Sequence, residues 1–169
     1  VQERAMADAA IEAGARRVYL VEAPIAIAAG AGVDVSKPNG HMVIDIGGGL
    51  TEVSVISNNG VVECEAIKTG GNAFDEAIVK YVRKKYEMVI SMKTAEELKK
   101  SIGAVLKRSD IDTEEVKGRD LKKGFAKTVT INSLELMEAF KEPINRILET
   151  VRSVIEKTPP ELVADIDTN

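Results

Sequence analysis

The chain has 169 residues, of which 44% are hydrophobic and 30% charged, and its formal net charge is −4. Dispersed Lys and Arg residues and an aromatic content of 4% argue against nucleic-acid binding, which needs concentrated positive charge or stacking surfaces. One cysteine, Cys64, excludes an internal disulfide, and no apolar run approaches the roughly 20 residues that span a bilayer, so we expect a soluble cytoplasmic protein.

The first third of the chain has the alternating order of an α/β protein. Alanines at helical spacing predict a helix over residues 2–13, and the run RVYLV predicts a strand over residues 17–21. Pro24 is suited to the first turn of the Ala-rich helix expected over residues 25–31. Because this first helix starts at the chain terminus with no cap, we also expect further sequence upstream.

A glycine-rich hairpin follows, with strands predicted over residues 42–46, 51–57 and 61–67. The first strand ends in Asp45, and Gly47, Gly48 and Gly49 form the turn. Backbone N–H groups of such a turn can bind an anion, and an acid beside it can hold a hydrated cation. The residues alone leave two interpretations open, a phosphate-binding turn with an acid for Mg²⁺, or a plain hairpin turn.

Two helices are predicted next. Residues 74–86 have apolar side chains at helical spacing, with Asn72 as the expected cap. The sequence TAEE, starting at Thr94, is typical of a capping box and predicts a helix over residues 95–106 with Val105 on its buried face.

The last third begins with two short strands, predicted over residues 116–121 and 126–131 with Gly124 in the turn between them. A long amphipathic helix is expected over residues 134–156, capped by Asn132 and Ser133 and bent or split by Pro143. A short helix over residues 161–166 follows. No internal repeat or low-complexity segment is present.

Five segments together resemble the MreB family of bacterial actins, within the actin–Hsp70–sugar kinase superfamily. They are VYLVEAPIAIAAGAG, MVIDIGGGLTEVSVI, GGNAFDEAIVKYVRKKY, TAEELKKSIG and EKTPPELVADI. The resemblance implies an α/β, actin-like ATPase fold, with a ribonuclease H-like mixed sheet, helices and a small α+β insertion subdomain. It implies only the second large domain, with residues 1–90 and 132–169 in an incomplete nucleotide-facing subdomain and residues 91–131 in the insertion.

The resemblance also implies ATP or ADP with Mg²⁺ as ligands, and site residues in three groups. Phosphates would be held by Gly47, Gly48, Gly49, Leu50 and Thr51. The nucleoside pocket would include Gly71, Asn72, Lys99 and Ser101, although Asn72 and Ser101 replace acids of the family pattern. Asp45 would reach the metal through water.

Two departures from the family pattern concern hydrolysis. Ala23 stands where the family has a water-orienting Glu, and Leu50 stands where it has a Thr. Hydrolysis needs a group that positions or activates water, and neither side chain supplies one. The resemblance therefore implies an ATP-binding cytoskeletal protein with weak or absent ATPase activity, and no residue is assigned a catalytic role.

As partners, the resemblance implies self-association into filaments for cell shape or motility, other MreB-type subunits and membrane-linked shape proteins. Any membrane attachment would lie in regions outside this chain. Two other functions remain open, an active ATPase or kinase of the superfamily, and a filament or interaction domain that works without nucleotide.

Overall fold

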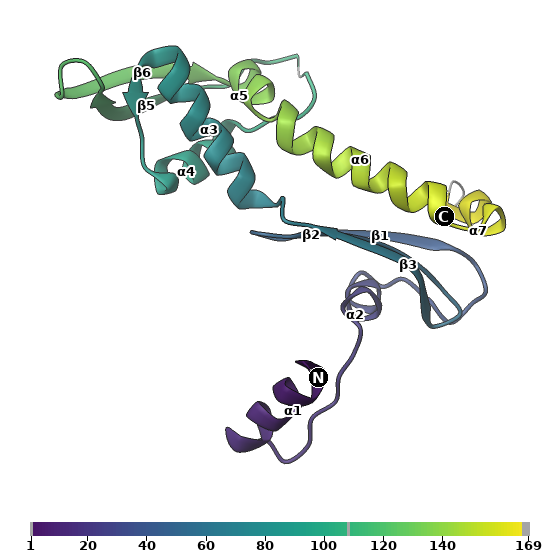
Figure 1. The fold of residues 1–169 in the computed structure, drawn as a ribbon. Coiled ribbons are helices and arrows are strands. Elements are labelled where there is room, and N and C mark those ends of the chain that lie inside the picture. The colour runs from purple at the N-terminus through teal and green to yellow at the C-terminus, as the bar shows by residue number, and fades with distance from the viewer. Residues whose placement is uncertain (1, 108, 167–169) are drawn as a thin grey trace. The chain divides into compact units, whose positions relative to one another are not determined.

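The computed structural model describes residues 2–107 and 109–166 (Figure 1). The chain forms two compact units. The first contains the N-terminal residues up to 43, residues 54–64 and the C-terminal residues from 157. The second contains residues 44–53 and 65–156. The expected division into residues 1–90 with 132–169 and residues 91–131 stays a prediction.

Three short helices belong to the first unit: α1 over Gln2–Glu12, α2 over Ala23–Gly30 and α7 over Pro160–Ile166. Pro24 lies in the first turn of α2, as its fixed φ angle favours. A small apolar cluster of α2, the following loop and the first sheet is formed by Ala28, Val35 and Ile56, with Ile25, Val33 and Val43 packed against it.

The strand predicted over residues 17–21 is wrong, because this segment has no regular secondary structure. Tyr19, Leu20 and Val21 are exposed at 77%, 55% and 65%. A strand needs a neighbour for its N–H and C=O groups, and neither sheet among the described residues includes this segment. High β-propensity alone did not produce a strand.

The first sheet has the order β1-β2-β3, with β1 over His41–Ile46, β2 over Thr51–Ser57 and β3 over Gly60–Ile67. Links as short as residues 47–50 and 58–59 can join only antiparallel neighbours, so the predicted meander is confirmed. Asn58 and Asn59 have φ angles of 51° and 60°, which are typical of a two-residue hairpin turn.

The second unit contains α3 over Gly71–Tyr86, α4 over Met92–Ile102 and a second sheet. Its strands β4, Met88–Val89, β5, Thr113–Asp120, and β6, Ala126–Asn132, are antiparallel in the order β4-β5-β6. The two-residue strand β4 was not predicted. Gly124, with φ of 75°, lies in the turn between β5 and β6 as expected.

The predicted start of α4 was too late. Ser91 is the cap, and its hydroxyl accepts the Thr94 N–H at 3.1 Å, so Thr94 lies inside the helix rather than before it. The helix ends at Ile102 with Gly103 as its C-cap. Val105 is therefore outside the helix and 56% exposed, contrary to its predicted burial.

The long C-terminal helix is split, as Pro143 predicted, into α5 over Ser133–Ala139 and α6 over Lys141–Lys157. The expected cap is also confirmed. The Asn132 side chain accepts the Glu135 N–H at 3.1 Å, and Glu135 accepts the Asn132 N–H at 3.0 Å. This reciprocal pair satisfies two N–H groups at the helix start.

One apolar core joins the helices of the second unit to its sheet. Phe74 and Phe140 meet edge to face, with ring centroids 5.0 Å apart, a geometry that adds to the gain from burial. The buried members of this core are Ile78, Val82, Met88, Ile90, Ala95, Leu98, Ile102, Val116, Ile131, Leu136 and Phe140.

Candidate functional site

The glycine turn between β1 and β2 presents a row of backbone N–H groups. The Gly47 N–H closes the turn on the Leu50 carbonyl at 2.9 Å. Among the described residues, the N–H groups of Gly48, Gly49 and Leu50 have no protein acceptor. None of the three glycines has a positive φ angle, so their contribution is the absence of a side chain, which leaves the backbone accessible to a ligand.

The start of α3 is built onto this turn. The Gly71 N–H donates to the Gly47 carbonyl at 2.9 Å, and the Asn72 N–H donates to the Gly48 carbonyl at 2.7 Å. The predicted cap at Asn72 is wrong, because Asn72 lies within α3 and Gly70 is the N-cap without a side-chain bond. The turn carbonyls satisfy helix N–H groups that a capping side chain would otherwise bind.

Two residues that sequence reasoning did not assign to the site, Gly70 and Thr69, fix these segments together. A Cβ atom on Gly70 would lie 2.5 Å from the Gly47 carbonyl oxygen and 2.8 Å from that of Gly48. The buried Thr51 hydroxyl donates to the Thr69 carbonyl at 2.6 Å. The pair Gly70-Gly71 before a helix was a visible signal of close packing, whereas Thr69 gave none.

Lys99 reaches the same place from α4. Its ammonium group donates to the Gly71 carbonyl at 3.0 Å and lies 2.8 Å from Asp75 Oδ1. The second contact is an ion pair rather than a well-aligned hydrogen bond. The Asp75 side chain is 7% exposed and that of Lys99 is 23% exposed, so water screens this pair less than a surface pair.

A cavity of about 300 Å³ opens beside the turn. Its wall combines backbone of the turn and of α3 with aromatic and aliphatic side chains and one cation. The lining residues are Ile46, Gly47, Gly71, Phe74, Lys99, Gly103, Val105 and Phe140. The structure thus brings Gly47, Gly71 and Lys99 of the predicted site together.

Asp45 is exposed at the end of β1. No group of three His, Cys, Asp or Glu side chains suited to a metal is found within residues 2–107 and 109–166. A single carboxylate nevertheless fits Mg²⁺, which usually keeps several waters and takes its other ligands from phosphate oxygens.

The remaining predicted residues are placed as follows. The exposed Ser101 donates its hydroxyl to the carboxylate of Glu114 on β5. Leu50 ends the glycine turn and is 45% exposed. Ala23 is the first residue of α2, in the first unit, where Glu22 is the N-cap.

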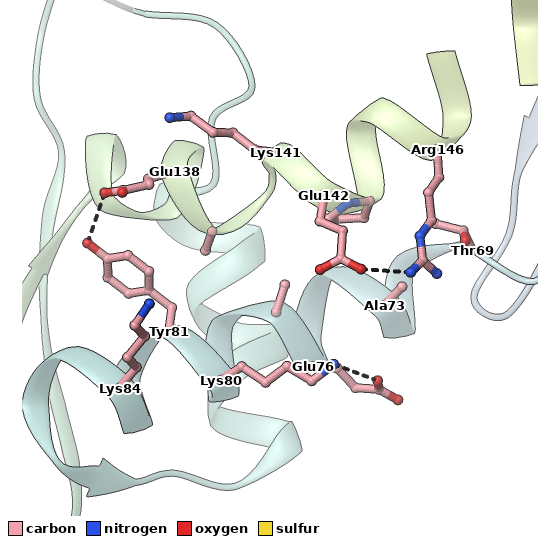
Figure 2. A pocket seen from close by; sticks show the side chains of 13 residues that line it. Thr69, Ala73, Glu76, Lys80, Tyr81, Lys84, Glu138, Lys141, Glu142 and Arg146 are labelled. Carbon is pink, nitrogen blue, oxygen red and sulfur yellow. Dashed lines mark hydrogen bonds and ion pairs between the residues drawn. The ribbon is translucent and has the colours of Figure 1, made fainter. Parts of the chain in front are cut away.

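A larger cavity, of about 410 Å³, lies along α3 and the α5–α6 segment (Figure 2). Several of its polar side chains interact with one another: Tyr81 Oη lies 3.5 Å from Glu138, and Arg146 lies 2.7 Å from Glu142. Lys80 lies 4.0 Å from Glu76. None of the predicted site residues lines this cavity, and its exposed ion pairs have little energetic weight.

Solved structures with the same architecture define the class of protein. The crystal structure of MreB 5 of Spiroplasma citri bound to AMPPNP matches with a TM-score of 0.93 and 38% identity, covering 96% of this chain and 49% of that one. A MamK structure, at 17% identity and a TM-score of 0.66 over 85% of this chain and 42% of that chain, supports the fold alone. The chain therefore has the α/β, actin-like fold that the sequence predicted.

The sequence model of the MreB/Mbl protein family matches residues 1–169, and the chain belongs to this family. It is 47% identical over 166 residues to the cell shape-determining protein MreB of Escherichia coli (strain K12). It is 39% identical over 166 residues to the cell shape-determining protein Mbl of Bacillus subtilis (strain 168). These matches cover 98% of this chain but only 48% and 50% of the relatives, so the chain spans about half their length. Within the described residues, no helix is long and apolar enough to cross a membrane.

Proposed function

We propose that this chain is the nucleotide-binding second large domain of an actin-like cytoskeletal protein. The observation that carries the proposal is the row of N–H groups at Gly48, Gly49 and Leu50 without a protein acceptor. Related structures support the ligand class, because MreB 5 of Spiroplasma citri was solved with AMPPNP and with ADP.

In this proposal the turn holds the β- and γ-phosphates through Gly47 to Thr51. Hydrogen bonds from N–H groups to a charged phosphate are about twice as strong as neutral ones. The Thr51 hydroxyl stays bonded to Thr69, so Thr51 contributes through its backbone. Mg²⁺, when bound, neutralises phosphate charge, and Asp45 orients one of its waters.

Hydrolysis is weak or absent in this proposal, because Ala23 and Leu50 carry no group that can orient water or accept its proton. Losing such a group costs roughly 10²–10⁴-fold in rate. The test is phosphate release by the full-length protein. The double variant Ala23→Glu with Leu50→Thr should raise the rate at least tenfold, and a wild-type rate equal to that of the double variant would contradict the assignment.

The cellular role proposed is filament formation for cell shape or motility, with other MreB-type subunits and membrane-linked shape proteins as partners. The names of the relatives, which are cell shape-determining proteins, support this role. We place residues 1–90 and 132–169 in the nucleotide-facing subdomain and residues 91–131 in the insertion. The protein would act in the cytoplasm, with any membrane attachment outside this chain.

Nucleotide binding is tested by titrating full-length protein with a fluorescent ATP analogue. Gly49→Val adds bulk to the turn where a Cβ atom meets nothing within 4 Å, so the fold should survive while affinity falls at least tenfold. Gly60→Val is the matched control at the first residue of β3, directly after the other hairpin turn, where a Cβ atom meets only Ser57 O at 3.7 Å. Equal affinity of the two variants would refute the phosphate-binding turn.

Electron microscopy with and without nucleotide tests the filament role separately. Protofilaments that form equally well without nucleotide and in the Gly49→Val variant would favour a nucleotide-independent interaction domain.

A further inference from the structure

The contacts of Lys99 within the protein argue against direct binding of a ligand by its ammonium group. Its ammonium group already serves two protein partners, the Gly71 carbonyl and the buried carboxylate of Asp75. Releasing this cation toward a ligand would leave Asp75, which is 5% exposed, without a counter-charge. A buried charge that loses its partner is strongly unfavourable, so Lys99 is held where it is.

Gly71 connects Lys99 to the glycine turn. The peptide groups of Gly71 and Asn72 point their N–H groups at the turn carbonyls of Gly47 and Gly48, and the Gly71 carbonyl accepts from Lys99. The contacts therefore run without a gap from α4, through the first turn of α3, to the turn between β1 and β2. All of these residues belong to the second unit.

The contacts between Lys99, the start of α3 and the glycine turn leave little room for displacement. A Cβ atom on Gly71 would lie 3.3 Å from Lys99 Nζ, and a Cβ atom on Gly70 would overlap the turn carbonyls. The start of α3 touches the turn backbone to backbone, so a displacement of Gly71 through its contact with the Lys99 ammonium group displaces the turn as well. Close-packed contacts transmit such shifts rather than absorb them.

We propose that Lys99 is a positioning residue, which sets the geometry of the Gly47–Leu50 turn through Gly71 and Asp75 and does not itself contact the nucleotide. The predicted effect of Lys99 on nucleotide affinity rests on the proposed nucleotide site. The predicted effect of Lys99 on the geometry of the turn does not. This role of Lys99 also links the position of α4 to the binding of nucleotide at the turn.

The test uses the full-length protein with Lys99→Met, and with Lys100→Met as the matched control. Lys100 is the next residue on α4, has a side chain that is 69% exposed and forms an ion pair with Glu96 at 2.7 Å. Lys99→Met could destabilise the fold by isolating Asp75, so a second variant combines Lys99→Met with Asp75→Asn and removes both charges together.

The first measurement is amide hydrogen exchange over residues 68–75 without nucleotide. The Gly71 and Asn72 amides should exchange at least tenfold faster in Lys99→Met and in the double variant, and at the wild-type rate in Lys100→Met. Unchanged exchange in the double variant would overturn the proposal, whether or not the protein binds nucleotide.

The second measurement compares ATP and ADP affinities. A positioning role predicts a loss of affinity for both nucleotides, at least as large for ATP as for ADP because the displaced turn holds the β- and γ-phosphates, and it predicts a similar loss for Asp75→Asn alone. A loss confined to Lys99→Met, with Asp75→Asn at the wild-type affinity, indicates direct contact between the ammonium group and the nucleotide and overturns the proposal. If wild-type protein binds neither nucleotide while exchange responds as expected, the proposed function fails and the positioning role stands.

Discussion

Replacing Gly70 with alanine tests how closely the start of α3 packs on the glycine turn. The φ and ψ angles of Gly70, −148° and −160°, are extended and impose no left-handed strain. The added Cβ atom would instead meet two carbonyl oxygens of the backbone, at 2.5 Å and 2.8 Å. Backbone cannot rotate away as a side chain can, so the two segments must separate.

The cost follows from what the separation disturbs. Overpacking of a close contact costs about 1–3 kcal/mol. Two hydrogen bonds, from the Gly71 and Asn72 N–H groups at 2.9 Å and 2.7 Å, are lengthened or lost, at about 0.5–1.5 kcal/mol each. We expect Gly70→Ala to lower the free energy of unfolding by about 2–6 kcal/mol.

Urea unfolding followed by circular dichroism measures this change, and Gly49→Ala provides the control. A Cβ atom on Gly49 meets nothing within 4 Å, so this variant should be neutral or stabilised by about 0.4–1 kcal/mol through loss of unfolded-state entropy. If Gly70→Ala were as stable as Gly49→Ala, the close backbone contact would not exist in solution.

Three further predictions concern buried polar contacts of the second unit. Thr51→Val keeps the side-chain shape but leaves the Thr69 carbonyl without its donor, and thermal unfolding should report a loss of about 1–3 kcal/mol; an unchanged melting temperature would contradict it. Burial raises the pKa of Glu135, but hydrogen bonds from Lys85 at 2.5 Å and Tyr86 at 2.6 Å lower it more, so the net shift is downward. A lowered carboxyl pKa contributes stability above about pH 4 that is lost as pH falls, so Glu135→Gln should destabilise at pH 7 and converge with wild type in acid; a pH-independent difference would refute this. Burial and the Glu135 carboxylate raise the pKa of Tyr86 to about 12, so stability should fall as pH rises from about 10. Ultraviolet titration should show a tyrosine that ionises near pH 12, and Tyr86→Phe should remove its contribution.

Local chemistry predicted several elements correctly. Asn132 caps α5 as predicted, in a reciprocal pair with Glu135, and Pro143 splits the helix because it has no N–H to donate. Asn58 and Asn59 specify their hairpin turn by tolerating positive φ angles. In each case the decisive interaction lies within a few residues of sequence.

Features that depend on distant partners were not predictable in the same way. The run at residues 17–21 has strand propensity but no neighbour to pair with. Asn72 had the chemistry of a cap, yet carbonyls of Gly47 and Gly48 fill that role. The glycine turn could be found from its composition, whereas the engagement of Lys99 by Gly71 and Asp75 depends on the packing of α3 against α4.

The exposed apolar segments have a practical consequence for work on this chain. Tyr19, Leu20 and Val21 are solvated, and Ile44 and Ile46 on β1 are 44% and 55% exposed. Exposed apolar segments and apolar edge strands of this kind can template amorphous or amyloid-like association. Sedimentation of the protein would therefore count as polymerisation only when a variant with a charged residue in place of Tyr19 still sediments. A thioflavin signal that disappears in that variant would identify the sediment as misfolded aggregate.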